Sequence, residues 1–331
     1  MIGIAKMGDR KRSDLFRVVA AEMRLEPAIV EKDYWVCYLL DYLFNRSEYK
    51  DSIIFKGGTS LSKAFGLIER FSEDVDLILD WRLIGYGIDE PWEERSNTKQ
   101  DKFKLDAIER TDEYLASTFA PSLKTGLSAE LGFEADVRAG AEEKTVLFVY
   151  PRLFSSESAL DVVKLEVGPL AAWSPSQRAK VTPYIAELHP EMFASPLTTV
   201  AVSPPERTFW EKATILHQEA NRPKGKAMPA RYARHYYDMY RLAHAGVADR
   251  AISSPELLAK VVAFKEKFYR TPWSKLEDAK PGTLKLSPQP ERLAELQADY
   301  EAMRPMLFGI VPSFEEIIDA MGELESRINN V

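Results

Sequence analysis

Two acidic residues separated by a single position, Asp74 and Asp76, lie in the short aliphatic run DVDLIL. Side chains two positions apart point to the same face of a β-strand, so the two carboxylates project together while Val75 and Leu77 face a core. Adjacent carboxylates repel each other unless a cation lies between them, and Mg²⁺ prefers hard oxygen ligands of this kind. We therefore predict a strand over residues 74–79 that carries a divalent-metal site for Mg²⁺ or Mn²⁺.

A double glycine precedes this strand and directly follows an apolar run at residues 53–55. The run predicts a strand that leads into a glycine turn, and residues 59–68 have the composition of a helix. Glycine lets backbone N–H groups approach an anion closely, and the start of a helix favours negative charge. Such a turn beside a metal site would hold the triphosphate of a nucleotide, and the residues expected to do so are Lys56, Gly57, Gly58, Thr59 and Ser60.

Neither half of this pattern is specific alone. A double glycine is commonly only a tight turn, and a pair of aspartates is commonly a solvated strand edge or an ion-pair site. The phosphate-binding patterns GxxxxGK[ST] and GxGxxG are both absent. The combination on one strand–turn–helix–strand unit is uncommon by chance, so we favour the nucleotide-binding interpretation.

A third carboxylate is expected from a neighbouring strand at residues 162–167. Its aliphatic residues share one face, whereas Lys164 and Glu166 share the other. Glu166 could complete the metal site, and Lys164 could balance its charge or join the nucleotide-binding residues. The alternative is an ordinary amphipathic strand with a solvated polar face.

The chain has 331 residues, 45% of them hydrophobic and 29% charged, which is typical of a globular protein rather than a disordered one. No run approaches the length of a membrane span, and residues 1–12 contain no apolar signal core. The single cysteine, Cys37, cannot form an internal disulfide, and the four histidines lack the spacing of a zinc site. We expect a cytoplasmic protein without a membrane partner.

The net charge of −7 at first argues against a nucleic-acid partner, but the charge is unevenly distributed. Residues 207–280 contain 15 Lys and Arg against 8 Asp and Glu, whereas the rest of the chain contains 29 against 43. The chain therefore pairs an acidic portion with a basic one.

The pattern along the chain predicts two domains, residues 1–202 and residues 203–331. The first has helices at 13–25, 27–44 and 95–120, and further strands at 134–137, 145–150 and, more weakly, 181–186. Beyond the prolines at 204 and 205 the expected elements are helices, at 206–219, 231–243, 255–269, 290–303 and 313–328.

Residues 57–61 (GGTSL) and 70–77 (RFSEDVDL) resemble the motifs of the AbiEii/AbiGii toxin family. These are nucleotidyltransferase-like toxins of type IV toxin–antitoxin and abortive-infection systems, within the DNA polymerase β-like nucleotidyltransferase superfamily. Residues 163–166, 205–213 and 231–240 resemble its strand, helical-lysine and last motifs, so the resemblance covers about residues 30–245. The chain departs from many members at Arg234 and His235, where they have Lys-Asp, but it retains Asp238.

The resemblance implies an α+β fold, with a nucleotidyltransferase-like mixed sheet in the N-terminal half and helices in the C-terminal half. It implies transfer of a nucleoside monophosphate from an NTP to an RNA acceptor, suggested to be a tRNA 3′ end, with release of pyrophosphate. It also implies a cognate antitoxin, which could be encoded by an adjacent gene. Metal ions would bind Asp74, Asp76 and Glu166, and the implied catalytic residues are Asp74, Asp76, Lys212 and Asp238.

Two of these residues have ordinary alternatives. Lys212 would contact the phosphates of the NTP, but most lysines are simply exposed on the surface. Asp238 would act near the nucleophile or orient Arg231 or Arg234, which lie seven and four residues before it on the same helix. Its alternative is a helical salt bridge, and the tyrosines of this helix are more often core residues than a platform for a base.

Residues 222–241 contain six Lys and Arg and one acidic residue. Such a run is usually a solvated face, but it could hold the phosphate backbone of an RNA, with Arg222, Lys224, Lys226, Arg231 and Arg234 as contacts. Ser72, two residues before Asp74, is a possible regulatory site, because a phosphate there would repel the NTP.

Two other functions remain open. The chain could be a nucleotidyltransferase that modifies a protein or a small molecule, such as an antibiotic-modifying enzyme. It could also be a nucleotide-binding regulator that no longer catalyses a reaction, although the intact pair of aspartates argues against this.

Overall fold

The computed structural model describes residues 1–72, 74–155, 161–169 and 175–330. The chain divides into two compact units, and we describe each by itself. The first unit contains residues 1–64 and 72–203, and the second contains residues 65–71 together with the chain from Pro204 onward. Residues 65–71 therefore belong to the second unit, although the sequence analysis included them in the first domain.

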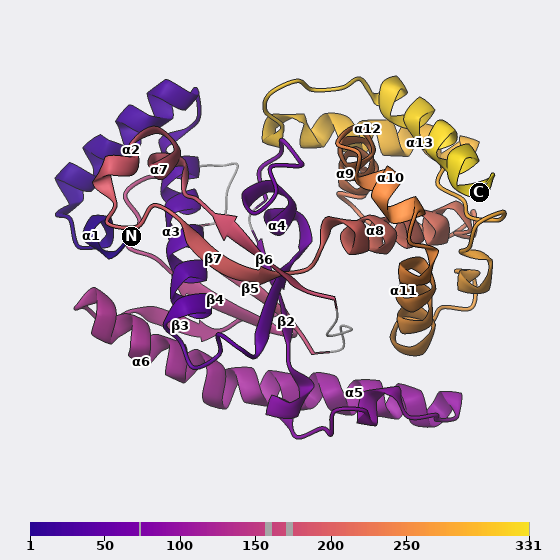
Figure 1. Cartoon of the computed structure of the whole chain (residues 1–331), viewed down its shortest axis with the longest axis horizontal. Coiled ribbons are helices and arrows are strands. Elements are labelled where there is room, and N and C mark those ends of the chain that lie inside the picture. The colour runs from indigo at the N-terminus through magenta and orange to yellow at the C-terminus, as the bar shows by residue number, and fades with distance from the viewer. Residues whose placement is uncertain (73, 156–160, 170–174, 331) are drawn as a thin grey trace. The chain divides into compact units, whose positions relative to one another are not determined.

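The first unit is built on a seven-stranded mixed sheet with the strand order β3-β4-β5-β2-β1-β7-β6 (Figure 1). Strand β2 is antiparallel to β1 and parallel to β5, and β1 is parallel to β7. This sheet confirms the predicted α+β class. The strands are β1 Ile53–Lys56, β2 Asp74–Leu79, β3 Asp136–Ala139, β4 Thr145–Val149, β5 Val163–Gly168, β6 Gln177–Val181 and β7 Thr198–Val202.

Helix α3, Pro27–Asn45, supplies much of the core of this unit. Trp35, Tyr34 and Tyr38 on this helix are fully buried, and the helix packs against β7. Proline at the first helical position suits the start of α3, because the missing N–H would have had no partner there. The other α-helices of the unit are α1 Ile2–Ala5, α2 Asp9–Met23, α4 Gly57–Lys63, α5 Asn97–Tyr114, α6 Ala120–Leu131 and α7 Tyr184–Leu188.

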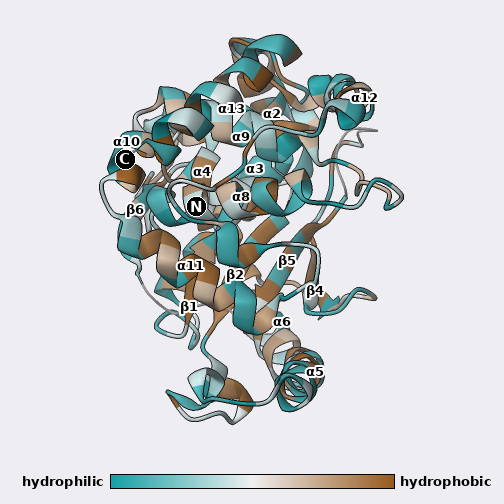
Figure 2. Cartoon of the chain, turned by 90° about the vertical axis from the view of Figure 1, so that its right-hand side faces the viewer, coloured by the Kyte–Doolittle hydropathy of each residue, from teal (hydrophilic) through white to brown (hydrophobic). Residues whose placement is uncertain are grey.

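The helix predicted to end at residue 120 continues to Leu131. A π-helical turn, Leu115–Phe119, joins α5 to α6, and Pro121 lies in the first turn of α6. A proline is tolerated in a first turn, so it does not end the helical path here. Most of α5 is polar, with only Ala107 and Thr111 buried, and Figure 2 shows α5 mostly teal and β5 largely brown.

Two predictions near the sheet were wrong, and one strand was missed. The weak strand at residues 181–186 is replaced by the end of β6 and by α7, which Pro183 precedes as N-cap. Strand β7 was missed, although four of its five residues are β-branched. Helix α4 begins at Gly57 and ends at Lys63, so the double glycine forms the first turn of the helix rather than a turn before it.

The second unit is helical, as predicted. Its helices are α8 Pro205–Ala220, α9 Ala233–His244, α10 Val247–Ile252, α11 Pro255–Phe268, α12 Leu293–Met303 and α13 Phe314–Asn329. Ser313 caps α13, because its hydroxyl accepts the N–H of Glu316 while the Glu316 carboxylate accepts the N–H of Ser313. The segment 65–71 packs into this unit through backbone hydrogen bonds, one from Phe71 N to Met306 O (2.8 Å) and one from Phe308 N to Glu69 O (3.0 Å).

Short 3₁₀ helices occupy Trp81–Ile84, Glu90–Trp92, Pro190–Met192, Leu276–Asp278, Pro290–Arg292 and Arg304–Met306. Over the described part of the chain, every helix is too short or too polar to cross a lipid bilayer.

Candidate active site

One face of the sheet in the first unit carries polar side chains in two adjacent rows. The first row crosses four strands, and its members, paired in register, are Lys56, Asp76, Glu166 and Thr145. The second row pairs Asp74 of β2 with Lys164 of β5. The three carboxylates predicted to bind metal therefore lie on the same face of two neighbouring strands.

The start of helix α4 is packed directly against β2. A Cβ atom added to Gly57 would lie 1.9 Å from Asp76 Oδ2, and the φ angle of Gly57 is +80°. Both observations require glycine at this position, because any side chain would displace the carboxylate and an L residue would be strained at this φ. Gly57 is thus needed for the close approach of this turn to Asp76.

The hydroxyl groups predicted to bind the nucleotide are engaged within the protein. Thr59 Oγ1 donates to the backbone carbonyl of Asp74, and Ser60 Oγ donates to Gly57 O at 2.8 Å. Both residues are buried. Their side chains therefore fix the geometry of the turn. A phosphate could then be contacted by the backbone of residues 57–60 rather than by these two hydroxyl groups.

The far end of α4 is anchored by a buried ion pair. Lys63 Nζ lies 2.7 Å from Asp33 Oδ1 on α3 and 4.0 Å from the centre of the Tyr184 ring. Asp33 also accepts the backbone N–H of Tyr184. This cluster holds α4 against α3 and α7, so both ends of the short helix that begins with the double glycine are fixed.

Lys164 joins the carboxylates of this face. Its Nζ atom lies 2.8 Å from Glu166 Oε1, 3.6 Å from Asp74 Oδ2 and 3.4 Å from Glu142 Oε2, which is in the loop between β3 and β4. Burial alone would lower the pKa of Lys164, but the hydrogen bond to Glu166 and the charges of Asp74 and Glu142 outweigh it and raise the pKa. The ammonium group therefore keeps its proton.

The donor chemistry of this face fits a divalent cation, because Asp74, Asp76 and Glu166 offer only hard carboxylate oxygens. Within the described ranges, however, no three Asp, Glu, His or Cys side chains are gathered closely enough to hold an ion. Lys164 contacts two of the three carboxylates. The aspartate pair of β2 therefore fits a divalent ion best, whereas the carboxylate of Glu166 is already paired with Lys164. The metal site stays a prediction.

A cavity of about 300 Å³ opens beside Asp76 and Glu166. Four of its lining residues are acidic and two are lysines, so it favours neutral or cationic groups over phosphates. The residues that line it are Lys56, Asp76, Glu142, Glu143, Lys144, Thr145, Glu166, Val167 and Gly168.

The second unit contains a buried ion cluster. Asp238 is fully buried, and its carboxylate accepts hydrogen bonds from Arg70 Nε (2.7 Å) and Nη2 (2.9 Å) and lies 2.7 Å from Lys212 Nζ. Burial on its own would raise the pKa of Asp238, but the charges and hydrogen bonds of Arg70 and Lys212 outweigh it and lower the pKa. Asp238 is an ionised residue that positions two cations.

These contacts correct the expected partners of Asp238. The expected partners were Arg231 or Arg234 on the same helix, whereas the bidentate partner is Arg70, from the segment 65–71. Arg231 precedes α9 with a φ of +61°, and its N–H donates to Asp299. Arg70 was missed as a functional residue, although it opens the RFSEDVDL motif.

The Lys212 and His235 side chains share this environment. Burial is the largest cause of the lowered pKa of Lys212, and Arg70 adds to it while Asp238 opposes it. Burial also lowers the pKa of His235 well below its ordinary value, with Lys212 and Arg234 nearby. His235 is therefore neutral, and among the described residues Asp238 is the acidic group that contacts both Arg70 and Lys212.

The basic residues predicted to contact RNA are not equivalent. Arg222 is buried and pairs with Glu219 at 2.7 Å, so it shapes the loop rather than offering a free cation. Lys224 is 83% exposed and pairs with Glu291. Lys226, like Arg231, is exposed, and Arg234 is half-buried.

Other predicted residues lie as follows. Tyr236 and Tyr237 are buried, so the core interpretation of the tyrosines holds for these two. Ser72 is half-buried at the entry to β2, and Glu73 lies outside the described residues.

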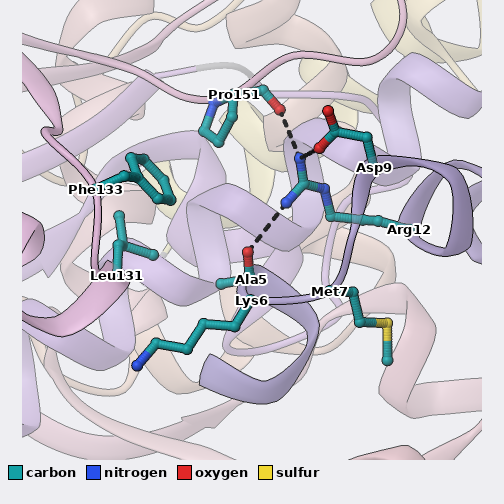
Figure 3. A pocket seen from close by; sticks show the side chains of 8 residues that line it. All are labelled: Ala5, Lys6, Met7, Asp9, Arg12, Leu131, Phe133 and Pro151. Carbon is teal, nitrogen blue, oxygen red and sulfur yellow. Dashed lines mark hydrogen bonds and ion pairs between the residues drawn. The ribbon is translucent and has the colours of Figure 1, made fainter.

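Another cavity of the first unit, of about 290 Å³, lies among the N-terminal helices (Figure 3). Arg12 crosses it and donates to Ala5 O and to Asp9 Oδ1, both at 3.0 Å. None of the predicted site residues is among those that line it, which are Ala5, Lys6, Met7, Asp9, Arg12, Leu131, Phe133 and Pro151.

The family described as "Nucleotidyl transferase AbiEii toxin, Type IV TA system" matches residues 38–320. Among solved structures, the chain is similar to MenT4, a nucleotidyltransferase toxin from Mycobacterium tuberculosis, with 19% identity, a TM-score of 0.49, and coverage of 95% of this chain and 87% of that chain. It is also similar to JHP933 from Helicobacter pylori, with 13% identity, a TM-score of 0.42, and coverage of 91% and 92%. No curated protein matches the sequence. Because the family match extends over most of the chain, the protein belongs to the AbiEii family of nucleotidyltransferase toxins of type IV toxin–antitoxin systems.

Proposed function

We propose that this nucleotidyltransferase transfers a nucleoside monophosphate from an NTP to the 3′ hydroxyl of an RNA and releases pyrophosphate. The proposed RNA is a tRNA. The observation that carries the proposal is the packing of the double-glycine turn against the aspartate pair: Gly57 lies against the Asp76 carboxylate, and Thr59 is bonded to the backbone of Asp74. This arrangement brings a backbone suited to phosphates next to carboxylates suited to divalent ions.

In the proposed reaction, Asp74 and Asp76 would hold two divalent ions, and Glu166 would help to hold the ion on the side of the nucleophile. One such ion would lower the pKa of the attacking hydroxyl, and the other would compensate charge on the leaving pyrophosphate. The backbone N–H groups at Gly57 and Gly58 orient the triphosphate. The contribution of these residues is positioning and charge compensation, which is what phosphoryl transfer chiefly requires.

Lys212 is assigned to the phosphates of the NTP, with Asp238 as the residue that positions it. The side chain of Lys212 is held within 2.7 Å of a carboxylate that is itself fully buried, so its rotamer is fixed before any ligand binds. Lys224, Lys226, Arg231 and Arg234 are assigned to the RNA backbone, because neutralised phosphates supply most of the affinity for nucleic acids.

The type IV toxin–antitoxin family implies an antitoxin partner. We propose that it is encoded next to this gene and that phosphorylation of Ser72 would block the NTP site. A Ser72→Glu variant with full transfer activity would contradict the proposed regulation by phosphorylation of Ser72.

The test is incubation of the purified chain with total tRNA and each of the four α-labelled NTPs, followed by gel separation. Label is expected on tRNA with the wild type and is expected to be lost with Asp74→Asn and Asp76→Asn. Asp136→Asn is the matched control, since Asp136 is a half-exposed aspartate on β3 of the same sheet.

A second candidate acceptor is a small molecule that carries amines and hydroxyls. The predominantly acidic lining of the cavity beside Asp76 and Glu166 favours it. Label that is absent from tRNA but present on a cationic small molecule would establish this alternative and contradict the RNA acceptor. If Asp74→Ala and Asp76→Ala left toxicity unchanged, a non-catalytic regulator would be indicated instead.

A further inference from the structure

Lys164 contacts carboxylates from three different elements. Its Nζ atom lies 2.8 Å from Glu166 on β5, 3.6 Å from Asp74 on β2 and 3.4 Å from Glu142 in the β3–β4 loop. Asp74 and Glu166 are two of the three residues to which we assign the divalent ion. The side chain of Glu142 is 75% exposed and has no place among those three.

An ammonium group and a divalent ion compete for the same oxygens. They repel each other through Coulomb's law, with twice the energy of two unit charges at the same separation. Asp74, Asp76, Glu166 and Glu142 carry four negative charges, and two lysines oppose them: Lys164, and Lys56, which pairs in register with Asp76. The net charge of two that remains is balanced by a single divalent ion.

We propose that Lys164 is the built-in counter-ion of the site and limits the nucleotide-free chain to one tightly held divalent ion. When that ion binds Asp74, the ammonium group shifts toward Glu142, which is already within reach and keeps the lysine paired. A second divalent ion then arrives only with the NTP, whose phosphates bring the additional negative charge. The proposal rests on the proposed function for the identity of the metal-binding carboxylates.

The experiment is titration of the nucleotide-free full chain with Mn²⁺, with free Mn²⁺ followed by electron paramagnetic resonance. We expect one tight Mn²⁺ per wild-type chain. Lys164→Met is expected to bind Mn²⁺ about tenfold more tightly, because a cation beside the ion is removed. It is also expected to gain a second measurable site, whereas Lys164→Arg keeps the charge and the wild-type titration.

Glu142 gives an independent measurement. Glu142→Gln is expected to weaken Mn²⁺ binding in the wild-type background, since Lys164 loses its alternative partner, and to have little effect when Lys164→Met is present. Lys124→Met is the matched control, because Lys124 on α6 pairs with Glu134 at 2.7 Å and is not among the residues that line the cavity beside Asp76 and Glu166. Its Mn²⁺ affinity is expected to stay within about threefold of the wild type.

Unchanged or weaker Mn²⁺ binding by Lys164→Met would overturn the proposal, and Lys164→Gln would decide the question if the methionine variant did not fold. A second tight Mn²⁺ on the wild-type chain would overturn it as well. If Asp74→Asn and Asp76→Asn left Mn²⁺ binding intact, the metal assignment of the proposed function would fail instead. The aspartate variants therefore test where the metal binds, and the Lys164 variants test how many ions bind and how tightly.

Discussion

Asp76 Oδ2 lies only 1.9 Å from the position that a Cβ atom on residue 57 would occupy, so Gly57 leaves the space that this carboxylate needs. The relationship joins the turn after β1 to the carboxylate of β2 without a side chain between them. It explains why position 57 is glycine in a chain that has an aspartate at position 76, since each residue constrains the position of the other.

Gly57→Ala is therefore expected to reduce nucleotidyl transfer by about 100-fold or more, since it displaces Asp76 and strains the backbone by roughly 1–3 kcal/mol. Transfer rates and urea unfolding of the same preparations are the measurements. Gly132→Ala is the matched control, because Gly132 has a φ of +81° but open space where a Cβ would lie. It is expected to lose stability but keep activity, and a fully active Gly57→Ala would refute the packing argument.

Asp238→Ala is expected to destabilise the protein by about 3–5 kcal/mol, because it leaves Arg70 and Lys212 buried without their counter-charge. Urea unfolding measures this. The combined variant Arg70→Met, Lys212→Met, Asp238→Leu is expected to recover much of the stability but no transfer activity. If the combined variant were active, the ion cluster would serve only the fold of the second unit.

Burial raises the pKa of Glu31 from an ordinary value of 4.5 to about 7, although the carboxylate accepts backbone N–H groups of Leu153 and Phe154. Between these two pH values the folded chain binds a proton that the unfolded chain has lost. The stabilising contribution is therefore complete below pH 4.5 and is lost as the pH rises through 7.

Glu31→Gln cannot titrate and serves as the reference for this effect. The free energy of unfolding of the wild type relative to Glu31→Gln is expected to fall by roughly 1–3 kcal/mol between pH 5 and pH 8. Urea titrations at several pH values measure it. A difference that is constant or rises with pH would contradict the raised pKa.

Lys224 and Lys226, the exposed lysines of the loop after α8, are expected to contribute to RNA affinity but not to the stability of the fold. Lys224→Ala with Lys226→Ala should weaken tRNA binding and reduce the slope of log K against log[salt] by about 1 to 2, with unchanged stability. Arg222→Ala should instead destabilise the chain, because Glu219 would lose its buried partner. Equal salt slopes for the double variant and the wild type would remove this loop from the RNA-binding surface.

Periodicity and composition were sufficient to predict the strands around the aspartate pair and most of the helices, because those segments have long or strongly alternating apolar patterns. They failed at residues 181–186, where Pro183 starts a helix in a segment rich in β-forming residues. They also failed at α6, where the path continues through a π-helical turn that no local pattern predicts.

The sequence by itself determined that two carboxylates share a strand face, that a double glycine precedes them, and that the C-terminal half is helical with a basic stretch at residues 207–280, since each of these depends on local spacing. Only the tertiary structure decided that Asp238 pairs with Arg70, 168 positions away, that Arg222 is buried, and that Lys164 contacts Asp74 and Glu166. Those outcomes depend on which segments pack together and which charges lose their water, and neither is encoded in the spacing of residues within one element.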